Sequence, residues 1–164
     1  MKLNKLQKKI GISFKDDKLL IQALTHKSFD TKNNYEKLEF LGDRVLGFVI
    51  SKKLLELYPN EKVGMIDKKL ANLVNKNKCF EIGKELELDN YILTGNTEKK
   101  KKVNIEKKII SDCCESLIGA IYIDKGFEVS SKFILNYWKN YLNLSDITVI
   151  LSLIHISEPT RQAE

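Results

Sequence analysis

The stretch from Tyr35 to Tyr58, YEKLEFLGDRVLGFVISKKLLELY, has the apolar spacing of one long helix. Pro59 follows directly, and helices usually end at or before the residue that precedes a proline. Apolar residues cover more than one stripe of this helix, so we expect it to lie centrally in the fold. Gly42 and Gly47 within it each cost roughly 1 kcal/mol relative to alanine. We therefore expect both glycines to allow close approach of a neighbouring helix or a ligand.

Helical spacing continues on both sides of this stretch. Asp16 or Asp17 is placed to cap a helix, and Gly11 and Gly126 are placed to end helices at their C-termini. The chain shows neither an internal repeat nor a convincing strand alternation. The expected helices cover residues 3–10, 17–24, 35–58, 67–77, 79–86, 109–124 and 127–141, joined by polar connections at 25–34, 88–96 and 98–108. This pattern predicts an all-α fold, with one domain over residues 1–146.

The composition is that of a globular chain with an excess of basic residues. Of the 164 residues, 43% are hydrophobic and 30% are charged, and the formal net charge is +6. A basic balance fits a partner that is rich in phosphate, although a lysine-rich composition by itself has the same effect on the charge.

Neither a secretion signal nor a membrane span is visible in the sequence. The segment before Gly11 lacks the apolar core of a signal peptide, and residues 147–156, the longest apolar stretch, are too short to cross a bilayer. Cys79, Cys113 and Cys114 suit reduced thiols. We therefore expect a soluble cytoplasmic protein that is not associated with a membrane.

Acidic residues occur within the two most hydrophobic helices. Glu36, Glu39 and Asp43 follow one another at spacings of three and four residues, which places all three on one helical face. Asp112 and Glu115 are three residues apart, so their side chains can meet. An ionised carboxylate in an apolar setting is unfavourable unless it is paired or binds a metal.

The sequence offers these acids few local partners, because no Lys or Arg lies between Ile109 and Ile123. If the two central helices pack together, four carboxylates converge and repel each other: Glu39, Asp43, Asp112 and Glu115. A hard divalent cation such as Mg²⁺ relieves this repulsion, and it can also hold a phosphate and a nucleophilic water. The alternative is that the acids lie on solvated faces and pair with lysines.

Three segments together resemble the ribonuclease III family. Tyr35-Glu-Lys-Leu-Glu-Phe-Leu-Gly-Asp-Arg-Val-Leu46 is similar to the signature segment of that family. The stretch from Asp112 to Ala120, followed by Asp124, is similar to a second motif, and Leu24-Thr-His-Lys-Ser28 to a third. The matches fall in the family's order across residues 2–142.

The resemblance implies an all-α endonuclease domain that forms a homodimer and cleaves double-stranded RNA, including precursors of rRNA and mRNA. By position, Glu39, Asp112 and Glu115 would bind Mg²⁺, for which Mn²⁺ can substitute. Asp43 would orient or deprotonate the attacking water, and Glu115 would also be catalytic. Hydrolysis would leave a 5′-phosphate and a 3′-hydroxyl.

Further residues are candidates for RNA binding or for support of the site. Arg44 follows the signature Asp where the family commonly has a small residue, so it can neutralise the acids or contact RNA. Glu36 is a supporting candidate. The lysines Lys99, Lys100, Lys101 and Lys102 can meet phosphates, with a solvated loop as the alternative. His26 is interpreted as a hydrogen-bonded structural residue.

The sequence departs from the family in two further places. The family often has an acid where this chain has Val63, so either Glu61 substitutes for it or the site works without it. The family also continues into a double-stranded-RNA-binding domain. Residues 147–164 do not resemble the start of that domain, and we interpret them as a tail that is non-native from about residue 151.

Two other functions compete with this interpretation. A non-catalytic, ribonuclease III-like protein that binds double-stranded RNA would be recognised by loss of the carboxylates, and all four principal acids are present. An unrelated helical metal phosphohydrolase generally places histidine beside aspartate, and this chain has only two histidines.

Overall fold

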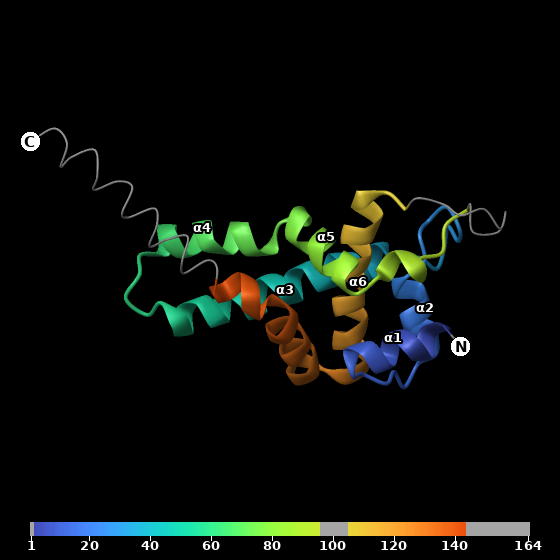
Figure 1. Ribbon diagram of the computed structural model, residues 1–164, viewed down its shortest axis with the longest axis horizontal. Coiled ribbons are helices and arrows are strands. Elements are labelled where there is room, and N and C mark those ends of the chain that lie inside the picture. The colour runs from blue at the N-terminus through green and yellow to red at the C-terminus, as the bar shows by residue number, and fades with distance from the viewer. Residues whose placement is uncertain (1, 96–104, 144–164) are drawn as a thin grey trace, which may run out of the picture.

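The computed structural model describes residues 2–95 and 105–143, and these residues are helical apart from turns and connections (Figure 1). The described part contains no strand, and its only β-pairing is an isolated bridge between Thr25 and Leu93. The helices are α1 (Lys2–Ile10), α2 (Asp17–Ala23), α3 (Glu36–Leu57), α4 (Val63–Val74), α5 (Lys76–Glu85), the 3₁₀ turn η1 (Leu88–Asn90) and α6 (Lys107–Lys125). A last helix occupies residues 127–143 of the described part. The predicted all-α fold is confirmed.

Helices α3 and α6 form the centre of the fold. Figure 1 shows α4 running back alongside α3, while α6 runs steeply across α3. Every residue of α6 from Ile109 to Ile121 is buried, so α6 is more enclosed than α3. Helix α3 buries one side and exposes Phe40 and Phe48 on another, at 63% and 60% exposure. The centre is therefore shared between both helices.

The crossing of α3 and α6 depends on two glycines that face each other. A Cβ atom at Gly42 would overlap the backbone carbonyl of Glu115, and one at Gly119 would overlap the carbonyl of Leu38. The close approach predicted for Gly42 is thus present. At Gly47 a Cβ atom would meet nothing within 4 Å, so none of the described segments approaches the helix closely there.

The helix ends agree with the sequence where a capping residue marks them. Asp16 caps α2 by accepting a hydrogen bond from the Lys18 backbone, and Gly11 and Gly126 adopt positive φ angles of 70° and 88° after α1 and α6. Helix α4, however, begins at Val63 rather than near residue 67, and its first turn adds Ile66 to the buried residues of this helix.

The helix predicted over residues 67–77 ends earlier, because Asn75 starts a new helix. Its side chain accepts a hydrogen bond from the backbone N–H of Lys78, which is the geometry of an N-cap. Helix α5 therefore begins at Lys76 instead of near residue 79. The last helix packs beside this junction, where Trp138 donates a hydrogen bond to the Leu73 carbonyl at 2.8 Å.

Candidate metal and catalytic centre

Three carboxylates from α3 and α6 meet close to where these helices cross. Glu39 comes from the first turns of α3, and Asp112 and Glu115 come from consecutive turns of α6. One oxygen from each lies within 4.8 Å of the other two. The side chains of Asp112 and Glu115 are 1% exposed and that of Glu39 is 23% exposed, so the cluster opens to solvent on the side of α3.

Lys76, the first residue of α5, reaches into this cluster. Its ammonium lies 2.9 Å from Asp112 Oδ1 and 3.2 Å from Glu39 Oε2. It also donates a hydrogen bond to Glu115 Oε1. Burial acts to lower the pKa of Lys76, but the hydrogen bonds to Glu115 and Asp112 outweigh it and hold that pKa well above its usual value. The lysine is therefore a cation, and the acids do have a partner that the sequence did not indicate.

Asp112 is the best satisfied of the three acids. Its Oδ2 accepts hydrogen bonds from the Tyr35 hydroxyl and from the Lys108 ammonium, each at 2.9 Å. Burial acts to raise the pKa of Asp112, but the hydrogen bonds from Lys108, Lys76 and Tyr35 lower it below its usual value. Burial and the nearby Asp112 charge raise the pKa of the Tyr35 hydroxyl. Asp112 is thus an ionised acceptor.

Glu115 is the least satisfied. Burial, followed by the adjacent Asp43 carboxyl, raises the pKa of Glu115 to about 8, although Lys76 acts in the opposite direction. Its Oε2 is buried and has no hydrogen-bond partner among the described residues. Burial and the charge of Asp112 also raise the pKa of Glu39. A buried carboxylate oxygen without a donor suits a ligand of a divalent cation, so these residues fit an oxygen-bound metal ion.

Asp43 and Arg44 lie at the rim of the cluster. The Asp43 side chain is 41% exposed and its Oδ2 accepts a hydrogen bond from Arg44 Nη1 at 2.6 Å. The Arg44 guanidinium also stacks over the Phe40 ring at 4.4 Å. Arg44 therefore neutralises Asp43, one of the two roles predicted for it. Asp43 remains beside Glu115 and accessible to solvent.

The other candidate residues do not join the cluster. Glu36 is exposed in the first turn of α3. Of the three acids predicted to share one face of this helix, only Glu39 therefore belongs to the cluster. Lys99 to Lys102 and residues 147–164 lie outside the described residues. His26 has a structural role, as predicted, with its Nδ1 2.7 Å from Ser28 Oγ. Within the described part, all three cysteines are buried and free.

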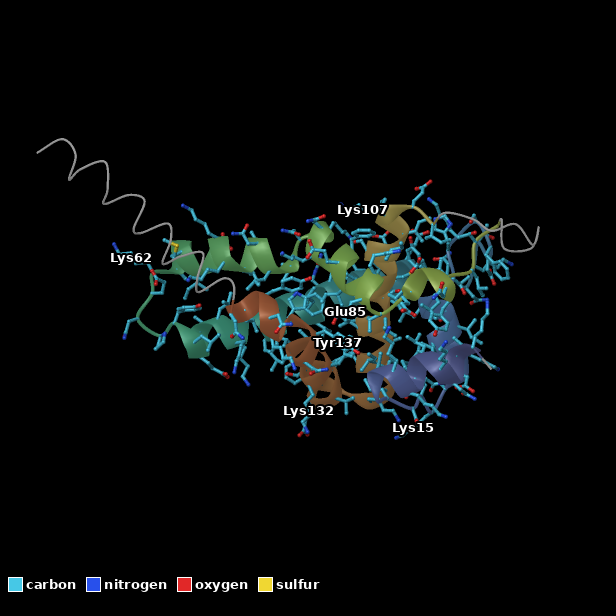
Figure 2. All side chains as sticks on the ribbon, in the orientation of Figure 1. Lys15, Lys62, Glu85, Lys107, Lys132 and Tyr137 are labelled. Atoms are coloured by element: carbon cyan, nitrogen blue, oxygen red, sulfur yellow. The ribbon has the colours of Figure 1, made fainter. Side chains whose placement is uncertain are left out.

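The position of the missing family acid lies at the opposite end of α3. Figure 2 shows Lys62, between Glu61 and Val63, at the far end of the hairpin formed by α3 and α4, away from Lys107 at the start of α6. Glu39 and the end of α3 at Leu57 are roughly 27 Å apart along the helix axis. Neither Glu61 nor Val63 therefore reaches the cluster of its own chain.

An all-α domain in which two crossing helices carry a buried set of carboxylates belongs to the class of helical domains with a candidate metal site. A family model described as Ribonuclease-III-like matches residues 16–142. The chain belongs to the ribonuclease III family, as its motifs predicted, and it is an endonuclease domain of that family.

Individual relatives support this membership. The chain is 59% identical over 152 residues to Ribonuclease 3 of Pelagibacter ubique, covering 92% of this chain and 68% of that protein. It is 40% identical to Ribonuclease 3 of Hahella chejuensis, covering 88% of this chain and 65% of that protein. The chain thus spans about two thirds of these relatives.

Solved structures show the same fold. The nuclease domain of ribonuclease III from Campylobacter jejuni superposes with a TM-score of 0.78 at 38% identity, covering 83% of this chain and 95% of that one. Dicer from Pichia stipitis has a TM-score of 0.66 at 20% identity, covering 82% and 60%, which shows the fold alone. Among the described residues, none of the helices has the length and apolarity needed to cross a membrane.

Proposed function

We propose that this domain hydrolyses phosphodiester bonds of double-stranded RNA in a magnesium-dependent reaction. The observation that carries the proposal is the Glu115 carboxylate, which is almost fully buried, has one oxygen without a donor, and lies within 4.8 Å of Glu39 and Asp112. Burying such a carboxylate is energetically unfavourable unless it coordinates a cation. Because the chain belongs to a family of nuclease domains, the group on which this cation would act is a phosphodiester.

The four principal acids have distinct roles in this proposal. Glu39, Asp112 and Glu115 hold Mg²⁺, for which Mn²⁺ can substitute. When bound, the ion polarises the scissile phosphate and lowers the pKa of a water molecule. Asp43, which is open to solvent beside Glu115, would orient the attacking water and accept its proton. As the water oxygen bonds to phosphorus, the P–O3′ bond breaks and the departing O3′ oxygen takes a proton from solvent, which leaves a 5′-phosphate and a 3′-hydroxyl.

Double-stranded RNA is the substrate that suits this surface. The net charge of +6 favours a polyanion, and A-form duplexes are recognised by backbone shape and 2′-hydroxyl groups rather than by base sequence. Arg44 at the rim and Lys99 to Lys102 are the proposed phosphate contacts. We assign the domain to the processing of rRNA and mRNA precursors in the cytoplasm, the compartment that suits its free thiols.

The domain works as a homodimer in this proposal. Phe40 and Phe48 on α3 are 63% and 60% exposed, and a two-fold pair would cover them. The nuclease domain from Campylobacter jejuni has a structurally flexible region that is involved in dimer formation. Sedimentation should give about twice the chain mass of 18.9 kDa. A monomer at micromolar concentration that retains full activity would contradict this.

The proposed activity is tested by replacing Glu115 with Gln, which keeps the shape and removes the charge. Cleavage of a long RNA duplex in Mg²⁺ should fall on the order of a thousandfold or more, while duplex binding remains measurable. Glu128→Gln is the matched control, since Glu128 is 85% exposed on the last helix and pairs only with Lys132 among the described residues. Undiminished cleavage by Glu115→Gln would refute the assignment. Duplex binding without cleavage by the unmodified chain would favour the non-catalytic alternative.

A further inference from the structure

The Lys76 ammonium, a cation of the chain itself, lies within the candidate metal cluster. The Lys76 ammonium donates to one oxygen of each of the three carboxylates. A lysine ammonium has three N–H donors, so the cluster takes all of them. The acceptors of Lys76 are the same residues whose oxygens form the candidate metal site: Glu39, Asp112 and Glu115.

The position of Lys76 is fixed by its backbone. Asn75 caps α5 by accepting a hydrogen bond from Lys78 N at 2.9 Å, which sets where the first residue of the helix lies. Ser111 Oγ donates to the carbonyl oxygen of Lys76 at 2.9 Å. Ser111 is 2% exposed and directly precedes Asp112, so one turn of α6 both supplies a candidate ligand and holds Lys76. The hydrogen bonds of its own backbone and of its neighbours therefore hold Lys76 beside the three carboxylates.

A site of this size holds one cation at a time. The oxygens around an octahedral Mg²⁺ lie roughly 3–4 Å apart, and the three candidate oxygens here lie within 4.8 Å of one another. A divalent ion and an ammonium at this point would repel each other and compete for the same oxygens. The Lys76 side chain is 57% exposed, which gives the ammonium a path into solvent.

We propose that Lys76 is a built-in competitor of the divalent ion, holding the three carboxylates together until the ion binds and then withdrawing into solvent. The inference rests on the proposed metal-dependent function and adds a determinant of metal affinity to it. Releasing one charge-assisted hydrogen bond changes an equilibrium by about tenfold or more. Lys76 therefore raises the ion concentration at half-saturation by about that factor.

The test compares Lys76→Met with Lys108→Met by calorimetric titration with MnCl₂, in the absence of RNA. Both variants lose one positive charge beside Asp112, but Lys108 donates to none of the other acids and its side chain is 77% exposed. The half-saturating concentration should fall about tenfold or more for Lys76→Met. For Lys108→Met it should change by less than about fivefold.

A second measurement uses the unmodified protein, so it does not depend on how a variant folds. Lysine acetylation is followed by mass spectrometry with and without MnCl₂. Acetylation of Lys76 should become several-fold faster when Mn²⁺ releases its ammonium. Lys84 is the internal reference, because its partner is Asp89, at 3.1 Å and outside the cluster.

The outcomes separate this inference from the proposed function. If Lys76→Met binds Mn²⁺ no more tightly than the unmodified protein, the competition is refuted but the metal site is not. The same holds if the acetylation rate of Lys76 does not change when Mn²⁺ is added. Absence of Mn²⁺ binding in the unmodified protein and both variants overturns the competition and the metal-dependent function together.

Discussion

Two carboxylates on α6 both expose little of their side chains, but they have opposite hydrogen-bonding surroundings. Near the C-terminal end, the Asp124 side chain is 4% exposed and accepts backbone hydrogen bonds from Lys15 at 2.9 Å and Asp16 at 3.1 Å. Burial acts to raise the pKa of Asp124, but these hydrogen bonds lower it below its usual value. Glu115, in the middle of the helix, has a pKa raised to about 8 and one oxygen without a donor.

The difference separates an acid that stabilises the fold from the acid that we propose as a metal ligand. Asp124 has its donors within the fold and ties the segment before α2 to the end of α6, so its charge stabilises the folded state. Glu115 is held in a setting that its charge does not favour, which is typical of groups that serve a ligand or a reaction. Both acids belong to the second sequence motif, and only the structure shows that their surroundings differ.

The largest effect should come from changing the backbone contact that positions Glu115. Gly42→Ala would place a Cβ atom against the Glu115 carbonyl, and the helices have to separate to admit it. We expect a loss of about 3 kcal/mol in the free energy of unfolding, measured by urea denaturation. Gly64→Ala, in the first turn of α4, is the matched control, and it should be neutral or stabilise the protein by up to about 1 kcal/mol because its Cβ meets nothing within 4 Å. Equal losses for both variants would show that the crossing is not tight.

A smaller effect compares the two acids directly through isosteric amides. Asp124→Asn should lose about 1–3 kcal/mol of unfolding free energy at neutral pH, because two hydrogen bonds lose their charged acceptor. Glu115→Gln should lose less in metal-free buffer, because the raised pKa of Glu115, about 8, means that its charged form adds little to the stability of the fold at neutral pH. A greater loss for Glu115→Gln than for Asp124→Asn would reverse the assignment of the two roles.

The smallest effect is the pH dependence of the Asp124 contribution. A carboxyl whose pKa is lower in the folded than in the unfolded protein stabilises the fold above its unfolded value, near 3.8, and this contribution is lost as the pH falls. The stability gap between the unmodified chain and Asp124→Asn should therefore shrink from pH 7 to pH 3. Urea denaturation of both proteins at several pH values gives that gap, and a gap that widens in acid would contradict the lowered pKa of Asp124.

Local spacing was sufficient to predict much of this molecule. The long helix over residues 35–58, the stop at Gly126 and the pairing of Asp112 with Glu115 depend on neighbours within a few residues, and the structure confirms them. The convergence of Glu39 with these acids followed from the packing of two apolar helices. Gly42 was identified for the same reason.

Tertiary contacts were beyond what the sequence alone could predict. Lys76 lies 36 residues before Asp112, and nothing in its own segment indicates that it enters the acidic cluster. Lys108 was overlooked because it falls just before the apolar run of α6, although it is one helical turn from Asp112. Glu36 shares a helical face with Glu39, but it lies at the exposed start of α3, beyond the reach of α6.

Our central hypothesis is that Glu115 binds a divalent ion while Asp124 stabilises the fold. A thermal unfolding series in MgCl₂ tests this hypothesis most directly. An ion at a hundred times its dissociation constant stabilises the folded state by about 2.7 kcal/mol. The Tm of the unmodified chain and of Asp124→Asn should rise by the same several degrees between EDTA and saturating Mg²⁺, and that of Glu115→Gln should not change. An equal rise in all three proteins would contradict the claim, because the ion would then bind without Glu115.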